Sequence, residues 1–159
     1  MRRRIFENIL RIFVGRSKRS NRPAGKIYRA IEGKLPILFH MGDKTRDFSA
    51  PRRLRAILER FPNLVVIGAH FGGYNAWEDS KKHLLNQNIY FDTSSSLFCL
   101  SPEEAAQMIR AHGADKMLFG TDYPMWDHEQ ELARFLALPL TEEERIAILG
   151  KNARALLNI

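Results

Sequence analysis

The chain contains four short apolar runs, and each of them ends in a histidine or an aspartate. These terminal residues are 30, 22 and 30 positions apart, so each interval has room for one strand and one crossover helix. Alternation at this spacing predicts a parallel sheet in an α/β fold. The runs are PILFH, ending at His40, LVVIGAH, ending at His70, NIYFD, ending at Asp92, and MLFGTD, ending at Asp122.

Parallel strands that run in one direction have their C-terminal ends at the same edge of a sheet. In α/β barrels this edge carries the catalytic residues. We therefore expect the two imidazoles and the two carboxylates to lie along one rim of the sheet.

Helix signals fill the intervals between the runs. Ser101, Pro102 and Glu104 predict a capping box at the start of a helix that ends at Gly113. Thr141 and Glu144 repeat the capping box for a last helix that extends to about residue 157. Residues 26–159 are therefore predicted to form a (βα)4 domain with a terminal helix. Further helices are predicted near 26–33, from about 49–51 to 61, near 75–86 and over 127–138.

The positive charge of the chain is concentrated at its start. Residues 1–30 hold ten Lys and Arg and one acidic residue, whereas the other 129 residues hold 15 basic and 17 acidic groups. The main body is therefore close to neutral, and no nucleic-acid groove is expected there. Residues 1–25 are predicted to be a basic N-terminal head, helical or poorly ordered, because Ile5, Ile9 and Phe13 have helical spacing. A membrane-surface or targeting helix and an RNA-contacting arm remain alternatives for this head.

Cys99 is the only cysteine, so an intrachain disulfide is impossible and a reducing compartment is expected. No apolar run approaches the roughly 18–20 residues of a membrane span. The basic start has no small-residue cleavage site at the expected distance, which argues against a secretory signal. The sequence therefore favours a cytoplasmic protein.

Imidazole and carboxylate groups are ligands that zinc and similar divalent ions prefer. Together, His40 and Asp122 are therefore candidate metal ligands. Each also has a structural interpretation, because a histidine at a strand end is often held by hydrogen bonds and Asp122 can cap the turn in GTDYP. Asp92 is followed by TSSS, whose hydroxyls favour a role in ordering the loop.

Two aromatic residues, Tyr123 and Trp126, follow the last run. They either cover the sheet or form part of an apolar wall around a substrate. The sequence contains neither the G-x-S-x-G motif of a nucleophilic serine nor a G-x-G-x-x-G or P-loop motif. Nucleotide cofactors therefore have no support.

The chain resembles the amidohydrolase-related family of metal-dependent hydrolases and decarboxylases. The resemblance covers about residues 26–159, and the pairing of GAHFGG with FGTDYP is its most specific part. Members of this family are (β/α)8 barrels. The resemblance therefore implies a partial TIM barrel, with about four parallel strands and crossover helices that correspond to its second half. The matching stretches are LPILFHMGD, FPNLVVIGAHFGGYNAWED, NIYFDTSSS and ADKMLFGTDYPMWD.

The resemblance also implies functional roles. His40 and Asp122 would bind a divalent metal, zinc above all, and Asp122 would also take a proton from the attacking water. His70 would orient that water or bind a small-molecule substrate, with Tyr123 and Trp126 nearby. The implied reaction is hydrolysis of a C–N or C–O bond, or decarboxylation.

The chain departs from the family pattern because it contains no His-x-His pair, which the family usually carries on its first strand. Three interpretations follow. The chain is a C-terminal half whose N-terminal half was lost or belongs to another polypeptide, or it forms a homodimer through open sheet edges. Alternatively, it is a non-catalytic half-barrel interaction protein that pairs through a sheet edge or through its basic head.

Overall fold

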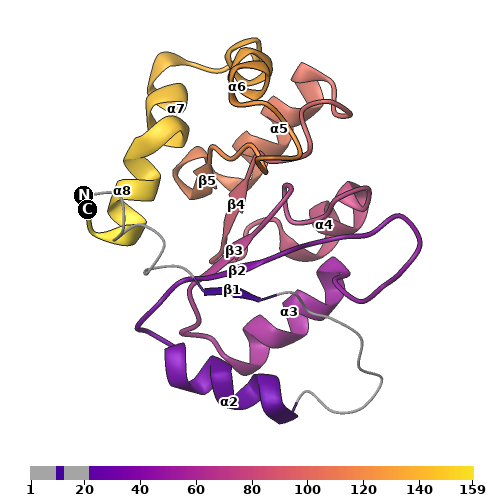
Figure 1. The fold of residues 1–159 in the computed structure, drawn as a ribbon, viewed down its shortest axis with the longest axis vertical. Coiled ribbons are helices and arrows are strands. Elements are labelled where there is room, and N and C mark those ends of the chain that lie inside the picture. Colours follow the sequence, from indigo (N-terminus) through magenta and orange to yellow (C-terminus); the bar gives the residue numbers. More distant parts are fainter. Residues whose placement is uncertain (1–9, 13–21) are drawn as a thin grey trace.

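In the part of the chain that the structure describes, five parallel strands form one sheet (Figure 1). The computed structural model describes residues 10–12 and 22–159. Neighbours in the sheet are also neighbours along the chain, in the order β1-β2-β3-β4-β5. The strands are β1 (Leu10–Ile12), β2 (Ile37–Phe39), β3 (Val66–Gly68), β4 (Tyr90–Asp92) and β5 (Met117–Leu118).

Strands β2 to β5 lie within the four apolar runs, and all of their pairings are parallel. In the register of the sheet, Leu38 is opposite Ile67, Gly68 is opposite Phe91, and Asp92 is opposite Leu118. The predicted α/β fold with four parallel strands is therefore confirmed.

Helices connect successive strands, and both predicted capping boxes are present. In Figure 1, α2 and α3 lie on the side of β1 and β2, whereas α5 to α8 surround β4 and β5. Within residues 22–159, every helix is too short or too polar to cross a lipid bilayer. The helices are α2 (Arg22–Ile31), α3 (Pro51–Arg60), α4 (Trp77–Leu84), α5 (Pro102–His112), α6 (His128–Leu136), α7 (Glu142–Ile146) and α8 (Asn152–Leu157). A 3-10 turn, η1 (Ala114–Lys116), precedes β5, and a π-helical turn, η2 (Ala147–Lys151), joins α7 to α8.

The helix predicted for the basic head is wrong for residues 10–12, which form strand β1. Leu10 pairs with Ile37 and Ile12 with Phe39, so β1 extends the sheet beyond β2. An apolar-basic-apolar triplet also fits the two-residue period of a strand, and pairing satisfies backbone groups that β2 would otherwise expose. The rest of the head, 1–9 and 13–21, lies outside the described residues. Helix α2 contains residue 25, where the basic head was expected to end and the (βα)4 domain to begin. The division of the chain into these two parts stays a prediction.

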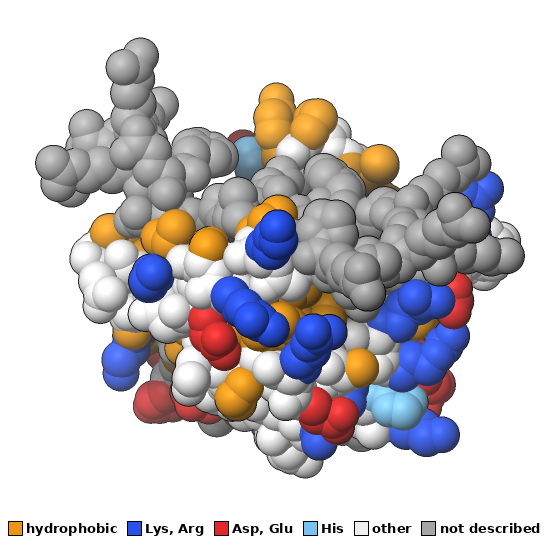
Figure 2. Space-filling model, turned by 90° about the horizontal axis from the view of Figure 1, so that it is seen from below, with side chains coloured by type: hydrophobic (Ala, Val, Ile, Leu, Met, Phe, Trp, Pro, Cys, Tyr) orange, Lys and Arg blue, Asp and Glu red, His pale blue; other side chains and the backbone are white. Residues whose placement is uncertain are grey.

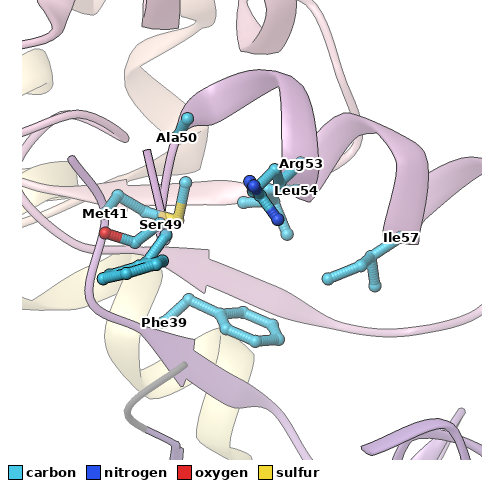
Figure 3. A pocket seen from close by; sticks show the side chains of 8 residues that line it. Phe39, Met41, Ser49, Ala50, Arg53, Leu54 and Ile57 are labelled. Atoms are coloured by element: carbon cyan, nitrogen blue, oxygen red, sulfur yellow. The ribbon is translucent and has the colours of Figure 1, made fainter. Parts of the chain in front are cut away.

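The main core lies between the sheet and its helices. Ile37, Phe39, Val66 and Phe91 are almost completely inaccessible to solvent. Figure 3 shows Phe39 and Met41 facing α3 across a hollow of about 20 Å³. This volume is about that of one water molecule, so the hollow belongs to core packing and has no room for a substrate.

The face that carries α2 and α3 has many exposed Lys and Arg side chains, with Asp and Glu among them (Figure 2). Arg52 and Arg53 both bind the carboxylate of Asp47, and Arg55 binds Glu59 one helical turn away. Exposed pairs of this kind contribute little to stability, typically below about 1 kcal/mol each.

The outer edge of β5 is covered by the C-terminal helical segment. Thr93 donates to the carbonyl of Leu118, so the backbone groups of Met117 and Phe119 point away from β4. The Asn152 side chain donates to the Met117 carbonyl over 2.8 Å and to the Ala114 carbonyl over 2.7 Å. The Phe119 amide donates to the carbonyl of Ile148 over 2.9 Å. At this edge the Met117 carbonyl and the Phe119 amide are therefore occupied by the chain itself.

Candidate active site

His40 and His70 come together at the C-terminal ends of β2 and β3. Nδ1 of His40 is 3.0 Å from Nε2 of His70, and the ring centroids are 4.9 Å apart at an interplanar angle of 70°. His40 is half-buried, and only 4% of His70 is exposed. Two imidazoles predicted from separate strand ends are therefore in direct contact.

The contacts of His70 determine where its proton lies. Its Nδ1 is 3.0 Å from the Ser94 carbonyl oxygen and 2.9 Å from the Ser94 hydroxyl. The carbonyl can only accept, and the hydroxyl donates its proton to Asp92 over 2.5 Å, so Nδ1 of His70 is the donor. In a neutral ring Nε2 then carries the lone pair, and it accepts from Nδ1–H of His40.

Asp92 has the contacts of a group that orders a loop. One of its oxygens, Oδ1, accepts from the backbone amide of His70 over 2.9 Å and from that of Ser94 over 3.1 Å. Together with the bond from the Ser94 hydroxyl, these contacts tie the loop after β4 to the turn after β3. Asp92 therefore holds the loop that fixes the His70 ring.

The turn after β3 has an unusual backbone. His70 and Phe71 have positive φ values of 63° and 52°, which are uncommon for residues with a side chain. Gly72 also has a positive φ, and a Cβ there would be 2.5 Å from the Phe91 ring. The turn is thus packed closely on β4. Such backbone conformations cost about 1–3 kcal/mol each and are concentrated at functional sites.

Asp122 lies beyond β5 and also has a positive φ, of 57°. Its Oδ2 accepts a hydrogen bond from the Ser95 hydroxyl over 2.8 Å, and that hydroxyl accepts from Nε1 of Trp126 over 2.9 Å. The carboxylate is close enough to His40 for their charges to interact. At this rim His40 therefore contacts His70 and lies within range of the Asp122 charge, and the roles predicted for the three residues stay predictions.

The electrostatic environment keeps His40 neutral. Burial is the main factor that lowers its pKa below the usual value, and the neighbouring His70 lowers it further. The charge of Asp122 and a hydrogen bond with the Gly42 backbone oppose this shift without reversing it. At neutral pH the ring is therefore in the form that can bind a metal.

The two aromatic residues predicted to contact substrate have different environments. Trp126 is half-buried, reaches Asp122 through Ser95 and stacks on Phe98 at a centroid distance of 4.5 Å. Tyr123 is 66% exposed and stacks on His128 at 4.7 Å. The sequence analysis missed Ser94 and Ser95 as contacts of His70 and Asp122, although their position directly after a strand end was an available signal.

Comparison with known protein families identifies the chain. The family model described as amidohydrolase matches residues 13–159. The chain belongs to the amidohydrolase family. The resemblance inferred from the strand-end motifs is therefore confirmed, and no curated protein sequence matches the chain.

Solved structures with the same fold are TIM-barrel proteins, so this amidohydrolase chain is a partial barrel. An uncharacterised TIM-barrel protein from Bordetella bronchiseptica superimposes with a TM-score of 0.74 and 24% identity, over 95% of this chain and 57% of that one. For 5-carboxyvanillate decarboxylase from Sphingomonas paucimobilis the TM-score is 0.71 and the identity 16%, over 96% and 58% of the two chains.

A third similar structure is a dihydroxybenzoic acid decarboxylase from a Polaromonas species, with bound manganese and the inhibitor 2-nitroresorcinol. It has a TM-score of 0.60 and 19% identity, over 86% of this chain and 53% of that one. The amidohydrolase chain thus spans little more than half the length of each of the three structures. At these identities the similarity establishes the fold.

The amidohydrolase superfamily is metal-dependent, and the rim has donors of a suitable type. A neutral imidazole at His40 and a carboxylate at Asp122 are both ligands of divalent ions. Within residues 10–12 and 22–159, no three His, Cys, Asp or Glu side chains lie close enough together to hold one ion. By chemical type alone, His40 and Asp122 are two donors that suit a divalent ion.

A second hollow of the amidohydrolase chain lies away from this rim. It has a volume of about 400 Å³ and lies at the N-terminal ends of β3, β4 and β5, where Asn63, Asn88, Tyr90 and Lys116 line it. His40, His70 and Asp122 line neither this hollow nor the one beside α3.

Proposed function

We propose that this chain supplies the second half of a metal-dependent amidohydrolase active site, which hydrolyses or decarboxylates a small molecule. His40 and Asp122 are the proposed metal ligands, and His70 and Asp122 are the proposed catalytic residues. The direct contact of His40 with His70, beside the Asp122 carboxylate, is the observation that carries this proposal.

A bound divalent ion would lower the pKa of a coordinated water toward neutrality. Asp122 would accept the proton of the attacking water, because a carboxylate beside the reacting group can act as a general base. His70 is buried, is anchored through Nδ1 to Ser94 and contacts His40 through Nε2. Its role is to orient the water or to bind the substrate.

Zinc is the proposed metal, because imidazole and carboxylate are among its common protein ligands. The manganese in the Polaromonas decarboxylase makes Mn²⁺ the second ion to test. The proposed substrate is a small molecule with a scissile C–N or C–O bond or a carboxylate, bound by His70, Tyr123 and Trp126. The two similar decarboxylases act on aromatic acids, which supports the carboxylate class. The cytoplasm remains the proposed compartment, on the basis of the single exposed Cys99.

Asp122→Asn is expected to weaken metal binding at least about tenfold, because removing even an outer partner of a metal ligand costs about 10- to 100-fold. The measurement is zinc and manganese content after dialysis, followed by titration with each ion. Asp115→Asn is the matched control, since it makes the same change at an exposed residue away from the rim. Equal metal content and equal affinity in both variants would refute the assignment of Asp122.

A second proposed function is that of a half-barrel that pairs with another polypeptide, either a complementing N-terminal half or a second copy. The support is that the chain covers about half of each similar barrel and that β1 ends the sheet among the described strands. Because the C-terminal segment covers β5, such pairing would occur at β1.

Arg11→Pro tests pairing at β1. Ile37 donates to Val65 in β3, so Leu38 is the residue of β2 that faces β1, and the amide of its partner Arg11 points outward. Proline removes this outward donor and is tolerated on an edge strand. If β1 pairs with another chain, light scattering will give an assembly for the wild type and a monomer for the variant. The same mass for both proteins would contradict pairing with a second copy.

A further inference from the structure

A continuous set of contacts runs from Asp122 into helix α6. Ser95 donates to Oδ2 of Asp122 over 2.8 Å, and Trp126 donates to the Ser95 hydroxyl over 2.9 Å. The direction of both bonds follows from chemistry, because a carboxylate only accepts and an indole N–H only donates. The single proton of Ser95 is therefore committed to Asp122.

Ser95 has little freedom to leave this position. It is 4% exposed, and its φ of 46° belongs to the left-handed region that few serines adopt. On either side of it, the hydroxyls of Ser94 and Ser96 are used within the loop, by Asp92 and by the Ser94 carbonyl respectively. In this loop Ser95 is thus the serine whose hydroxyl reaches Asp122.

Trp126 is also held in place. Its ring stacks on Phe98, and the guanidinium of Arg134 lies 5.2 Å from its centroid. Arg134 in turn forms an ion pair with Glu131, which is completely buried in α6. A fixed indole and a fixed hydroxyl leave the Asp122 carboxylate little freedom to rotate.

We infer that Ser95 and Trp126 are positioning residues that fix the Asp122 carboxylate for metal binding, an inference that rests on the proposed function. Ser95 donates to Oδ2 of Asp122, and the carboxylate oriented in this way is the group that would hold the metal. Outer partners of this kind orient metal ligands, and their removal typically weakens affinity about 10- to 100-fold.

Manganese titration tests the inference, with the signal of free Mn²⁺ followed by electron paramagnetic resonance. Ser95→Ala is expected to bind Mn²⁺ about 10- to 100-fold more weakly than the wild type. Trp126→Phe keeps the ring and removes only the N–H, so it should weaken binding by less. Ser96→Ala is the matched control, because its hydroxyl bonds to Ser94, and it should stay within about twofold of the wild type.

The indole N–H resonances provide a readout that does not depend on metal. The chain has two tryptophans, so each resonance is assigned by one substitution. Asp122→Asn should shift the Trp126 resonance. In a Ser95→Ala background, Asp122→Asn should no longer shift it. A serine with a merely structural role would not transmit the change at Asp122 to Trp126. If the Ser95 variant folds poorly, the inference can still be tested with Asp122→Asn alone, which must shift the Trp126 resonance.

The outcomes separate this inference from the proposed function. If Asp122→Asn loses Mn²⁺ affinity while Ser95→Ala and Trp126→Phe bind as tightly as the wild type, the positioning role is overturned and the metal assignment stands. If the wild type binds neither Zn²⁺ nor Mn²⁺, the proposed function fails and the inference fails with it. A Trp126 resonance that ignores Asp122→Asn would also overturn the inference.

Discussion

Gly42→Ala is expected to lower the free energy of unfolding by about 3 kcal/mol or more. This loss is the sum of two costs, one from a close contact of the added Cβ and one from a strained backbone. Gly42 has a φ of 81°, and a Cβ there would be 2.3 Å from the carbonyl oxygen and 2.4 Å from the amide nitrogen of Tyr74. These atoms belong to the backbone, so no side-chain rotation relieves the contact. Gly42 lies two residues after His40 and pairs with Tyr74, so the substitution would also move the candidate site.

Gly33→Ala is the matched control for this prediction. Gly33 also has a positive φ, of 70°, but a Cβ there would meet nothing within 4 Å. Its cost should therefore be the conformational strain alone, about 1–2 kcal/mol. Urea unfolding of both variants gives the comparison. Equal losses of stability in the two variants would show that the close approach of Gly42 to Tyr74 does not add to the cost of Gly42→Ala.

Asn152→Asp is expected to cost about 3 kcal/mol or more, although the two side chains have nearly the same shape. The Asn152 amide donates to the carbonyls of Ala114 and Met117, and the residue is 8% exposed. An ionised aspartate would leave both carbonyls without a donor and place a negative charge against them. Each unsatisfied buried group costs about 1–3 kcal/mol, and a charged one costs more.

Asn158→Asp makes the same chemical change at an exposed position near the end of α8. It should change the free energy of unfolding by less than about 0.5 kcal/mol, as surface substitutions usually do. Thermal unfolding of the two variants provides the measurement. A similar, small effect for both would mean that the amide of Asn152 is dispensable for holding β5.

The sequence was sufficient to predict strands β2 to β5 and the contact of His40 with His70 at two strand ends. Apolar runs that end in His40, His70 and Asp122, at intervals of one strand plus one helix, allow few other arrangements. The capping boxes at Ser101 and Thr141 were equally predictable, because their signal lies within four residues of chain. Local patterns and strand polarity carry this part of the fold.

The remaining features depend on contacts that sequence spacing does not encode. Leu10–Ile12 fits a helical or a strand period, and only its pairing with β2 decides between them. The bond from Ser95 to Asp122 joins residues 27 positions apart, and both residues have positive φ values. Such backbone conformations arise from tertiary packing, so no local signal selects Ser95 over Ser94 or Ser96.

The two edges of the sheet have different consequences for self-association. Endless growth of strand-paired chains would require the β1 edge of one molecule to join the β5 edge of the next, since only a head-to-tail contact can repeat without closing. The bonds from Asn152 and to Ile148 occupy the second of these edges. Among the described strands, an assembly that pairs only through the β1 edge is therefore finite, because the C-terminal segment lies along the β5 edge.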